Sequence, residues 1–67
     1  MLKNDLKIAI IRAGKTNVQV ARECGITAQY VSEIITGRRI PSLPLALKIC
    51  KAINKTIEEV FWLEPDE

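Results

Sequence analysis

A short joint, Cys24-Gly25-Ile26-Thr27, lies between two amphipathic segments and strongly restricts how this chain can fold. Gly25 can adopt a positive φ at little cost and so can end a helix. Ile26 can turn toward an apolar interior, and Thr27 can cap the helix that follows. The sequence therefore predicts two helices, over about residues 17–24 and 28–36, that meet at a fixed angle.

The start of the first of these helices is marked by a capping box. Thr16 and Gln19 have the T-x-x-Q spacing in which the hydroxyl and the amide each satisfy a backbone N–H, so the helix is expected to begin at Asn17. Helical periodicity then assigns an inward side to both helices. Its members are Val20, Ala21, Cys24, Val31 and Ile34.

Similar signals predict three more helices. Asn4 is expected to cap a first helix over about residues 5–13, and Ser42 a fourth helix that tolerates Pro44 in its first turn. A second box, from Thr56 to Glu59, opens a final helix that is expected to run through about Leu63. The fourth helix is expected to bury Leu43, Leu47, Ile49, Cys50 and Ile53. The prediction is a compact all-α fold of five helices.

Length and composition agree with one small domain over residues 1–67. Hydrophobic residues make up 48% of the chain, but Phe, Trp and Tyr occur once each, so the core is expected to be aliphatic. No apolar run approaches the roughly 20 residues that span a bilayer, and no signal-peptide pattern begins the chain. We expect a cytoplasmic protein with no membrane contact.

The residue types that usually carry catalysis or bind metal are sparse. The chain has no histidine, and Cys24 and Cys50 lack the spacing of a metal site, so both are interpreted as buried thiols. No Ser, Cys or Lys has neighbours that would activate it. We expect no metal, no cofactor, no catalytic residue and no enzyme activity.

Charge is distributed unevenly along the chain, although its formal net value is only +2. All ten Lys and Arg lie within residues 1–57 beside three acids, whereas residues 58–67 hold five acids and no base, which gives about +7 and −5. The basic part is suited to phosphates, and the acidic end is expected to lie away from a duplex or to damp non-specific binding.

The stretch from about Leu6 to Phe61 resembles the Cro and C1-type repressor domain, the lambda-repressor-like five-helix module of phage repressors and XRE-type regulators. The resemblance rests on the inward residues, the joint, the Gly37-Arg38-Arg39 loop, Pro41-Ser42-Leu43, LALKICKAI and EEVF. It implies a helix-turn-helix over about residues 16–37 and a double-stranded DNA operator as partner. Many members pair an Arg on the first helix with a Glu near the end of the recognition helix. Here Ile10 and Ile35 stand at those positions, and we expect them to pack together.

The resemblance assigns base reading to the outward side of the recognition helix. Gln29 can pair with adenine, Ala28 can touch a thymine methyl, and Ser32 lies beside them. Glu33 can accept from cytosine N4, orient Arg38 or Gln29, or reject wrong sequences. The expected base-reading residues are Ala28, Gln29, Ser32 and Glu33.

Contacts to the DNA backbone are expected from both ends of the helix-turn-helix and from the loop that follows it. Tyr30 can either reach a phosphate through its hydroxyl or cover the helix with its ring. Lys15 stands where the family often has an apolar residue, so either its ammonium extends toward the DNA backbone or the local packing differs from that of the family. The expected phosphate-contacting residues are Thr16, Asn17, Thr27, Tyr30, Thr36, Arg38 and Arg39.

One module covers little of a groove, so two copies on half-sites one helical turn apart are expected. Val60, Trp62 and Leu63 are the candidate surface for a homodimer. The sequence thus predicts a sequence-specific transcriptional regulator, phage-like and expected to be a repressor. A protein-interaction module, such as an antitoxin or repressor modulator with DNA binding secondary, and an excised domain of a longer repressor stay open as alternatives.

Overall fold

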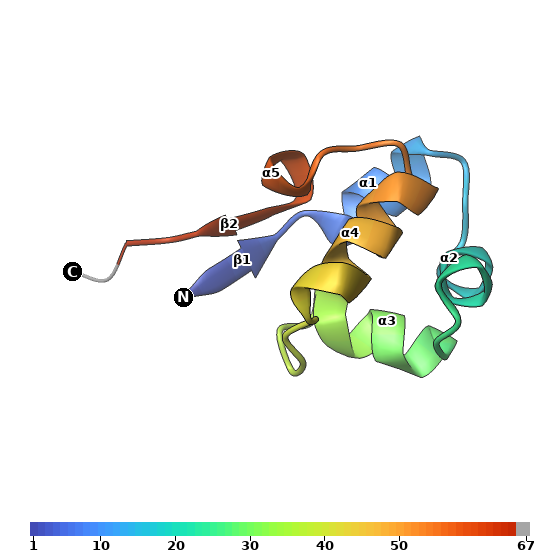
Figure 1. Ribbon diagram of the computed structural model, residues 1–67, viewed down its shortest axis with the longest axis horizontal. Coiled ribbons are helices and arrows are strands. Elements are labelled where there is room, and N and C mark those ends of the chain that lie inside the picture. The colour runs from blue at the N-terminus through green and yellow to red at the C-terminus, as the bar shows by residue number, and fades with distance from the viewer. Residues whose placement is uncertain (66–67) are drawn as a thin grey trace.

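The computed structural model describes residues 1–65 and contains five helices and a two-stranded ribbon (Figure 1). The order along the chain is β1 Leu2–Asn4, α1 Leu6–Arg12, α2 Asn17–Cys24, α3 Ala28–Ile35, α4 Leu43–Ala52, α5 Ile57–Val60 and β2 Phe61–Leu63. The first four helices lie within or close to the expected ranges. In this part of the chain every helix is too short or too polar to cross a bilayer.

The expectation of a purely all-α fold was wrong at the two ends of the chain. The final helix stops at Val60 instead of continuing through Leu63, and Phe61 takes an extended conformation with φ −125° and ψ 139°. Strand β2 then pairs antiparallel with β1, in the register Leu2↔Leu63, Lys3↔Trp62 and Asn4↔Phe61. The ribbon projects from the helical body and brings Leu2 and Leu63 side by side (Figure 1).

The helix starts follow the capping chemistry of the sequence. Thr16 and Gln19 form the predicted box, and the Ser42 hydroxyl accepts from the Leu45 N–H at 3.3 Å. At α5 the Glu59 carboxylate accepts from the backbone N–H and the hydroxyl of Thr56, at 2.9 and 3.0 Å, and these bonds lower the pKa of the Glu59 carboxyl.

The side chain of Asn4 bonds to two helices. The N-cap position of α1 is Asp5 and not Asn4 as expected, and Asp5 makes no capping bond through its side chain, but the side-chain oxygen of Asn4 accepts from the Leu6 N–H at 3.1 Å. Its amide nitrogen donates to the Ile34 carbonyl at 3.1 Å, near the end of α3. The strand β1 is thereby bonded to both α1 and α3.

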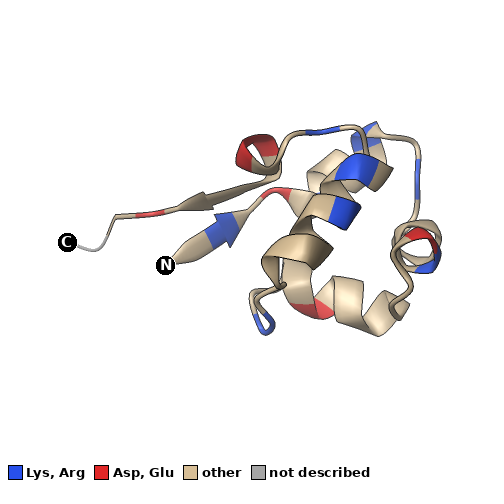
Figure 2. Cartoon of the chain, viewed as in Figure 1, with Lys and Arg blue, Asp and Glu red and all other residues tan. Residues whose placement is uncertain are grey.

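Acidic and basic side chains separate in space much as they do along the chain. Glu58 and Glu59 lie on α5, and Glu64 follows the ribbon, whereas most basic residues lie on the helical body and its loops (Figure 2). The remaining two acids of the predicted acidic end, Asp66 and Glu67, lie outside the described residues. The described acids of the C-terminal stretch therefore lie on α5 and after the ribbon, whereas Glu23 and Glu33 lie on α2 and α3.

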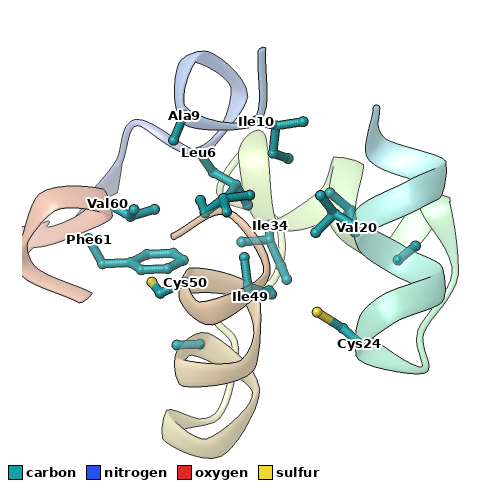
Figure 3. Close-up of a cluster of buried hydrophobic side chains, with 14 residues drawn as sticks. Leu6, Ala9, Ile10, Val20, Cys24, Ile34, Ile49, Cys50, Val60 and Phe61 are labelled. Carbon is teal, nitrogen blue, oxygen red and sulfur yellow. The ribbon is translucent and has the colours of Figure 1, made fainter. Parts of the chain in front are cut away.

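A single aliphatic core joins all the helices. Leu6, Ile10, Val20, Val31, Ile34, Ile49 and Val60 have almost no exposed surface, and Cys24, Cys50 and Phe61 are buried beside them (Figure 3). Two expectations for α4 were wrong, because Leu43 and Leu47 are 63% and 50% exposed. The buried side of this helix instead consists of Ala46, Ile49 and Cys50, with Ile53 just beyond its end.

Candidate nucleic-acid interface

The joint between α2 and α3 has the geometry that the sequence predicts. Gly25 is left-handed with φ 72°, and the Ile26 N–H donates to the Ala21 carbonyl at 2.9 Å. The Thr27 hydroxyl accepts from the Tyr30 N–H at 3.0 Å, so α3 starts immediately after the turn. With Ile26 packed against the core, the angle between the two helices is fixed by hydrogen bonds and by packing.

Helix α3 presents a polar, nearly uncharged side to solvent. Val31 and Ile34 are fully buried, which turns the opposite side of the helix outward. Gln29 and Ser32 are exposed, and Ala28 and Glu33 are half-buried at the edges of the same side. All four predicted base-reading residues thus lie on one surface.

The loop after α3 folds back onto the helix that precedes it. Gly37 has φ 81°, and the N–H groups of Arg38 and Arg39 both donate to the Glu33 carbonyl, at 2.9 and 3.2 Å. The Thr36 hydroxyl donates to the same carbonyl at 3.2 Å. These bonds hold two arginines next to the exposed side of α3.

Arg39 is oriented by two side chains of α3. Its Nε donates to the Glu33 carboxylate at 3.2 Å, and its guanidinium carbon lies 4.5 Å from the centre of the Tyr30 ring. The expected partners of Glu33 were Arg38 or Gln29, but the carboxylate takes Arg39 instead. The left-handed turn at Gly37 explains this choice, because it reverses the chain and returns Arg39 toward the helix.

The first turn of α2 is organised by its capping box. The Thr16 hydroxyl accepts from the Gln19 N–H at 3.2 Å, and the Gln19 side chain accepts from the Thr16 N–H at 2.9 Å. The side chain of Thr16 is exposed and that of Asn17 half-buried. Both residues lie at the positive end of the helix dipole, where anions are favoured.

The Lys15 ammonium is bound by groups of the protein itself. Its ammonium contacts both oxygens of the Glu23 carboxylate, at 2.8 and 2.9 Å, and donates to the Ala52 carbonyl at 2.7 Å. Of the two possibilities left by the sequence, different local packing is the correct one. Lys15 joins α2 to the end of α4.

Ile10 and Ile35 are the two residues that were expected to pack together. Ile10 is 1% exposed, and Ile35 is half-buried and packed against the core cluster that contains Ile10. Both isoleucines line the same surface hollow, between α1 and α3. Ile35 is therefore neither solvated nor remote from Ile10, and direct packing of the two side chains stays a prediction.

Both cysteines are buried, as expected, and neither is bonded to the other. Burial raises the pKa of the Cys24 thiol, and the nearby Glu23 raises it further. Burial also raises the pKa of the Cys50 thiol, with a contribution from Glu59. Residues 1–65 hold no cluster of Cys, Asp or Glu side chains that could bind a metal ion.

The ribbon end of the molecule exposes apolar side chains. Val60, a predicted interface residue, is fully buried and presents no surface, whereas Trp62 and Leu63 are 44% and 76% exposed. A hollow of about 230 Å³ lies between the ribbon and the loop after α3, with Leu2, Ile40 and Pro41 in its lining. We call Trp62, Leu63 and this hollow the apolar end.

Comparison with known proteins places this arrangement among helix-turn-helix proteins. The Helix-turn-helix family model HTH_3 matches residues 6–60. An uncharacterized HTH-type transcriptional regulator of Bacillus subtilis, YgzD, is 43% identical over 65 residues, which cover 97% of this chain and 98% of that protein. An uncharacterized HTH-type transcriptional regulator of Methanocaldococcus jannaschii is 36% identical, over 98% of this chain and 100% of its own.

The fold also matches a solved structure. The crystal structure of a protein from Bacteroides fragilis, described as DNA-binding, superposes with a TM-score of 0.83 and covers 91% of this chain and 98% of its own. The two sequences are 21% identical, so this likeness concerns the fold alone.

Proposed function

This chain belongs to the helix-turn-helix family that its residues 6–60 match, and we propose that it is a sequence-specific, DNA-binding transcriptional regulator that acts as a repressor. The observation that carries the proposal is the exposed side of α3. It offers hydrogen-bonding groups with Glu33 as its one charged side chain, on a helix whose direction is fixed by the Gly25 joint. A rigid, polar helix of this kind is suited to the major groove.

Base reading is assigned to the four residues on this side of α3. The exposed Gln29 amide can donate to and accept from one adenine, and the Ala28 methyl can contact thymine. Ser32 can pair with several bases. Glu33 has a smaller share in direct reading because its carboxylate is held by Arg39.

Phosphate contacts are assigned to the groups around this helix. Arg38 and Arg39 lie in the loop after α3, while Thr16 and Asn17 lie at the positive end of α2. Tyr30 acts mainly through its ring, which supports the guanidinium of Arg39. The remaining proposed contacts are the hydroxyl groups of Thr27 and Thr36.

We assign dimerisation to the apolar end. Trp62 and Leu63 are exposed beside a hollow whose lining is apolar apart from Asn4 and Arg39, and a second copy of this chain would cover them. Two copies would place two α3 helices on one operator with two-fold symmetry. A dimer seated on an operator within a promoter would repress by excluding polymerase, in the cytoplasm of its host cell.

The test is selection of bound duplexes from a random pool, followed by titration of the selected site and a scrambled one. Gln29→Ala is expected to weaken binding to the selected site by about 1–3 kcal/mol and to leave the scrambled site unchanged. Arg38→Ala is the matched comparison, because loss of a phosphate contact weakens both sites equally. Both residues are exposed, so neither change disturbs the core.

An enriched motif with two-fold symmetry would support a dimeric regulator. Binding without sequence preference would contradict the proposal and favour the second reading, a protein-interaction module that uses the apolar end. In that case Leu63→Ser, and not Gln29→Ala, would abolish the function.

A further inference from the structure

Much of the positive charge of this chain lies away from the residues that we assign to DNA contact. Two adjoining hollows, of about 700 and 470 Å³, share Lys15 and Ala52 in their linings. The first lies between α2 and α4, and the second between the ends of α1 and α4. Four basic residues line the first hollow and two more line the second, and together they form what we call the basic face: Arg12, Lys15, Arg22, Lys48, Lys51 and Lys55. None of the proposed DNA contacts lines either hollow.

The acids around the basic face neutralise only part of its charge. Lys15 is bound by Glu23, and the Lys55 ammonium lies 3.8 Å from the Glu59 carboxylate. The other four cations are exposed and form no ion pair within residues 1–65: Arg12, Arg22, Lys48 and Lys51. Basic positions are visible on α4, on α2 and on the loop before α2 (Figure 2). The face therefore keeps a net positive charge that the fold does not use.

The groups of the first hollow favour carboxylates over phosphates. Proteins commonly hold phosphate with free backbone N–H groups at helix starts or in turns. This hollow lies toward the C-terminal ends of α2 and α4, and the N–H groups of Lys15 and Gly25 are bonded to the Ile10 and Arg22 carbonyls. The described lining thus meets an anion with side-chain cations. One carboxylate is already held there, because Glu23 lines the hollow at 2.8 Å from the Lys15 ammonium.

Helix α2 separates the basic face from the proposed DNA interface. Thr16 and Asn17, at its start, line the hollow against α1 and α3, whereas residues 22–25 line the hollow against α4. The basic face is therefore free to meet a second molecule when α3 lies in a groove. Its hollows are open to solvent and do not enclose a small molecule as ligand pockets do. An extended segment of another macromolecule suits them better.

We propose that the basic face binds an acidic segment of another protein while α3 is bound to DNA. Carboxylates of that segment would pair with Arg22, Lys48 and Lys51, the cations of the first hollow that have no partner of their own. Complementary charge would steer the two proteins together. The docking goes beyond the proposed function, and only its use at an operator rests on that function.

The measurement is the fluorescence anisotropy of a labelled oligoglutamate peptide, with oligoglutamine as the uncharged control. Each peptide is titrated with the free protein and with its complex with the selected duplex. At about 0.1 M salt, where charges more than about 10 Å apart are largely screened, both forms are expected to bind oligoglutamate within a few-fold of each other. Neither is expected to bind oligoglutamine. If the duplex displaces the peptide, the basic face belongs to the nucleic-acid interface and the inference is wrong.

Two double variants with the same change in net charge locate the site. Lys48→Gln/Lys51→Gln is expected to weaken oligoglutamate binding about tenfold and to keep the wild-type affinity for the selected duplex. Arg38→Gln/Arg39→Gln alters the proposed phosphate contacts and is expected to do the reverse. An equal loss of peptide binding in the two variants would mean that net charge alone attracts the peptide, and would overturn the inference.

Amide NMR shifts of the labelled protein show where the peptide lies. The largest changes are expected in the second half of α4 and at the end of α2, and changes confined to the apolar end would contradict the proposal. All four substituted side chains are exposed, so circular dichroism is expected to show folded variants.

Thermal unfolding tests the structural explanation of the same lysines. Lys51 lies in the last turn of α4, where a cation stabilises the helix end. If Lys48→Gln/Lys51→Gln lowers the unfolding midpoint and binds the peptide like wild type, the two lysines serve the helix alone and the inference is wrong. A wild type that binds oligoglutamate at this face but has no affinity for any duplex would overturn the proposed function and support the docking surface.

Discussion

The side-chain amide of Asn4 donates to the main-chain carbonyl of Ile34 at 3.1 Å. This bond joins the first strand to the end of the recognition helix, across 30 positions of sequence. Ile34 lies in the last turn of α3, and its carbonyl also accepts from the Gly37 N–H at 3.1 Å. The terminal ribbon therefore helps to fix the helix on which the proposed base contacts lie.

The first prediction separates the two bonds of Asn4. Asn4→Ala removes both and is expected to lower the free energy of unfolding by about 1–2 kcal/mol. Asn4→Asp keeps an oxygen that can accept from the Leu6 N–H but loses the donor to Ile34. Urea denaturation is expected to rank the proteins as wild type, Asp, then Ala. Equal stability of wild type and Asn4→Ala would show that the amide bonds are not needed.

The second prediction concerns the Glu33–Arg39 pair. Both side chains are partly exposed, so Glu33→Gln is expected to change the free energy of unfolding by no more than about 0.5 kcal/mol. Its effect on binding is larger, because a carboxylate beside phosphates opposes non-cognate duplexes. Titration of the scrambled duplex is expected to show tighter binding by Glu33→Gln and hence a smaller specificity ratio. Unaltered discrimination would assign Glu33 a structural role only.

The third prediction tests the apolar end. Leu63→Ser is expected to weaken self-association in sedimentation equilibrium without loss of helicity, because Leu63 is exposed. Ile11→Ser is the matched control, since Ile11 is 64% exposed on α1 and outside the apolar end. The assignment fails if both variants associate like wild type, or if Ile11→Ser alone dissociates.

The fourth prediction concerns stability at alkaline pH. Burial raises the pKa of both thiols in the folded state, so the unfolded chain loses these protons first as the pH rises. The corresponding stability is present below the pKa of a solvated thiol, about 8.5, and is lost as the pH rises through the folded-state values. Urea unfolding between about pH 7 and 10 is expected to show this fall.

The control for that fall is the double variant Cys24→Ala/Cys50→Ala. It is expected to start from a lower stability, because two buried side chains are shortened, and to decline less steeply with pH. A parallel decline in both proteins would mean that other groups cause the loss.

The joint and the helix starts could be predicted because their chemistry is local. A capping box joins residues three apart, and a left-handed turn depends on one glycine, so Thr16, Gly25 and Thr27 are informative without knowledge of the rest of the fold. The burial of Val31 and Ile34 follows from the same short-range periodicity. The base and phosphate contacts of this unit stay predictions.

The ribbon could not be predicted in this way. Each of its strands has three residues, too few for an alternating pattern, and their pairing depends on the meeting of distant segments. The box at Thr56 indicates where α5 begins, and no glycine or proline before Pro65 marks its end. The early end of this helix also explains Val60, which turns into the core while Trp62 and Leu63 continue outward.

Two other differences have a similar origin. Helix α4 is apolar around much of its circumference, so periodicity alone did not decide whether Leu43 and Leu47 or Ala46 and Ile49 face the core. Packing against α2 and α5 decides it. The Arg39–Tyr30 contact spans a loop that reverses the chain, and no fixed spacing between residues in the sequence predicts such a contact.

The pairing of β1 with β2 also sets an order of events during synthesis. Residues 2–4 leave the ribosome early but have no strand to join until residues 61–63 have emerged, so a nascent chain can form the Gly25 joint before it can form the ribbon. The Asn4 side chain then reaches Ile34 only once the domain is almost fully translated. A chain without residues 61–63 would carry the helix α3 without the strand pairing that positions Asn4 against it.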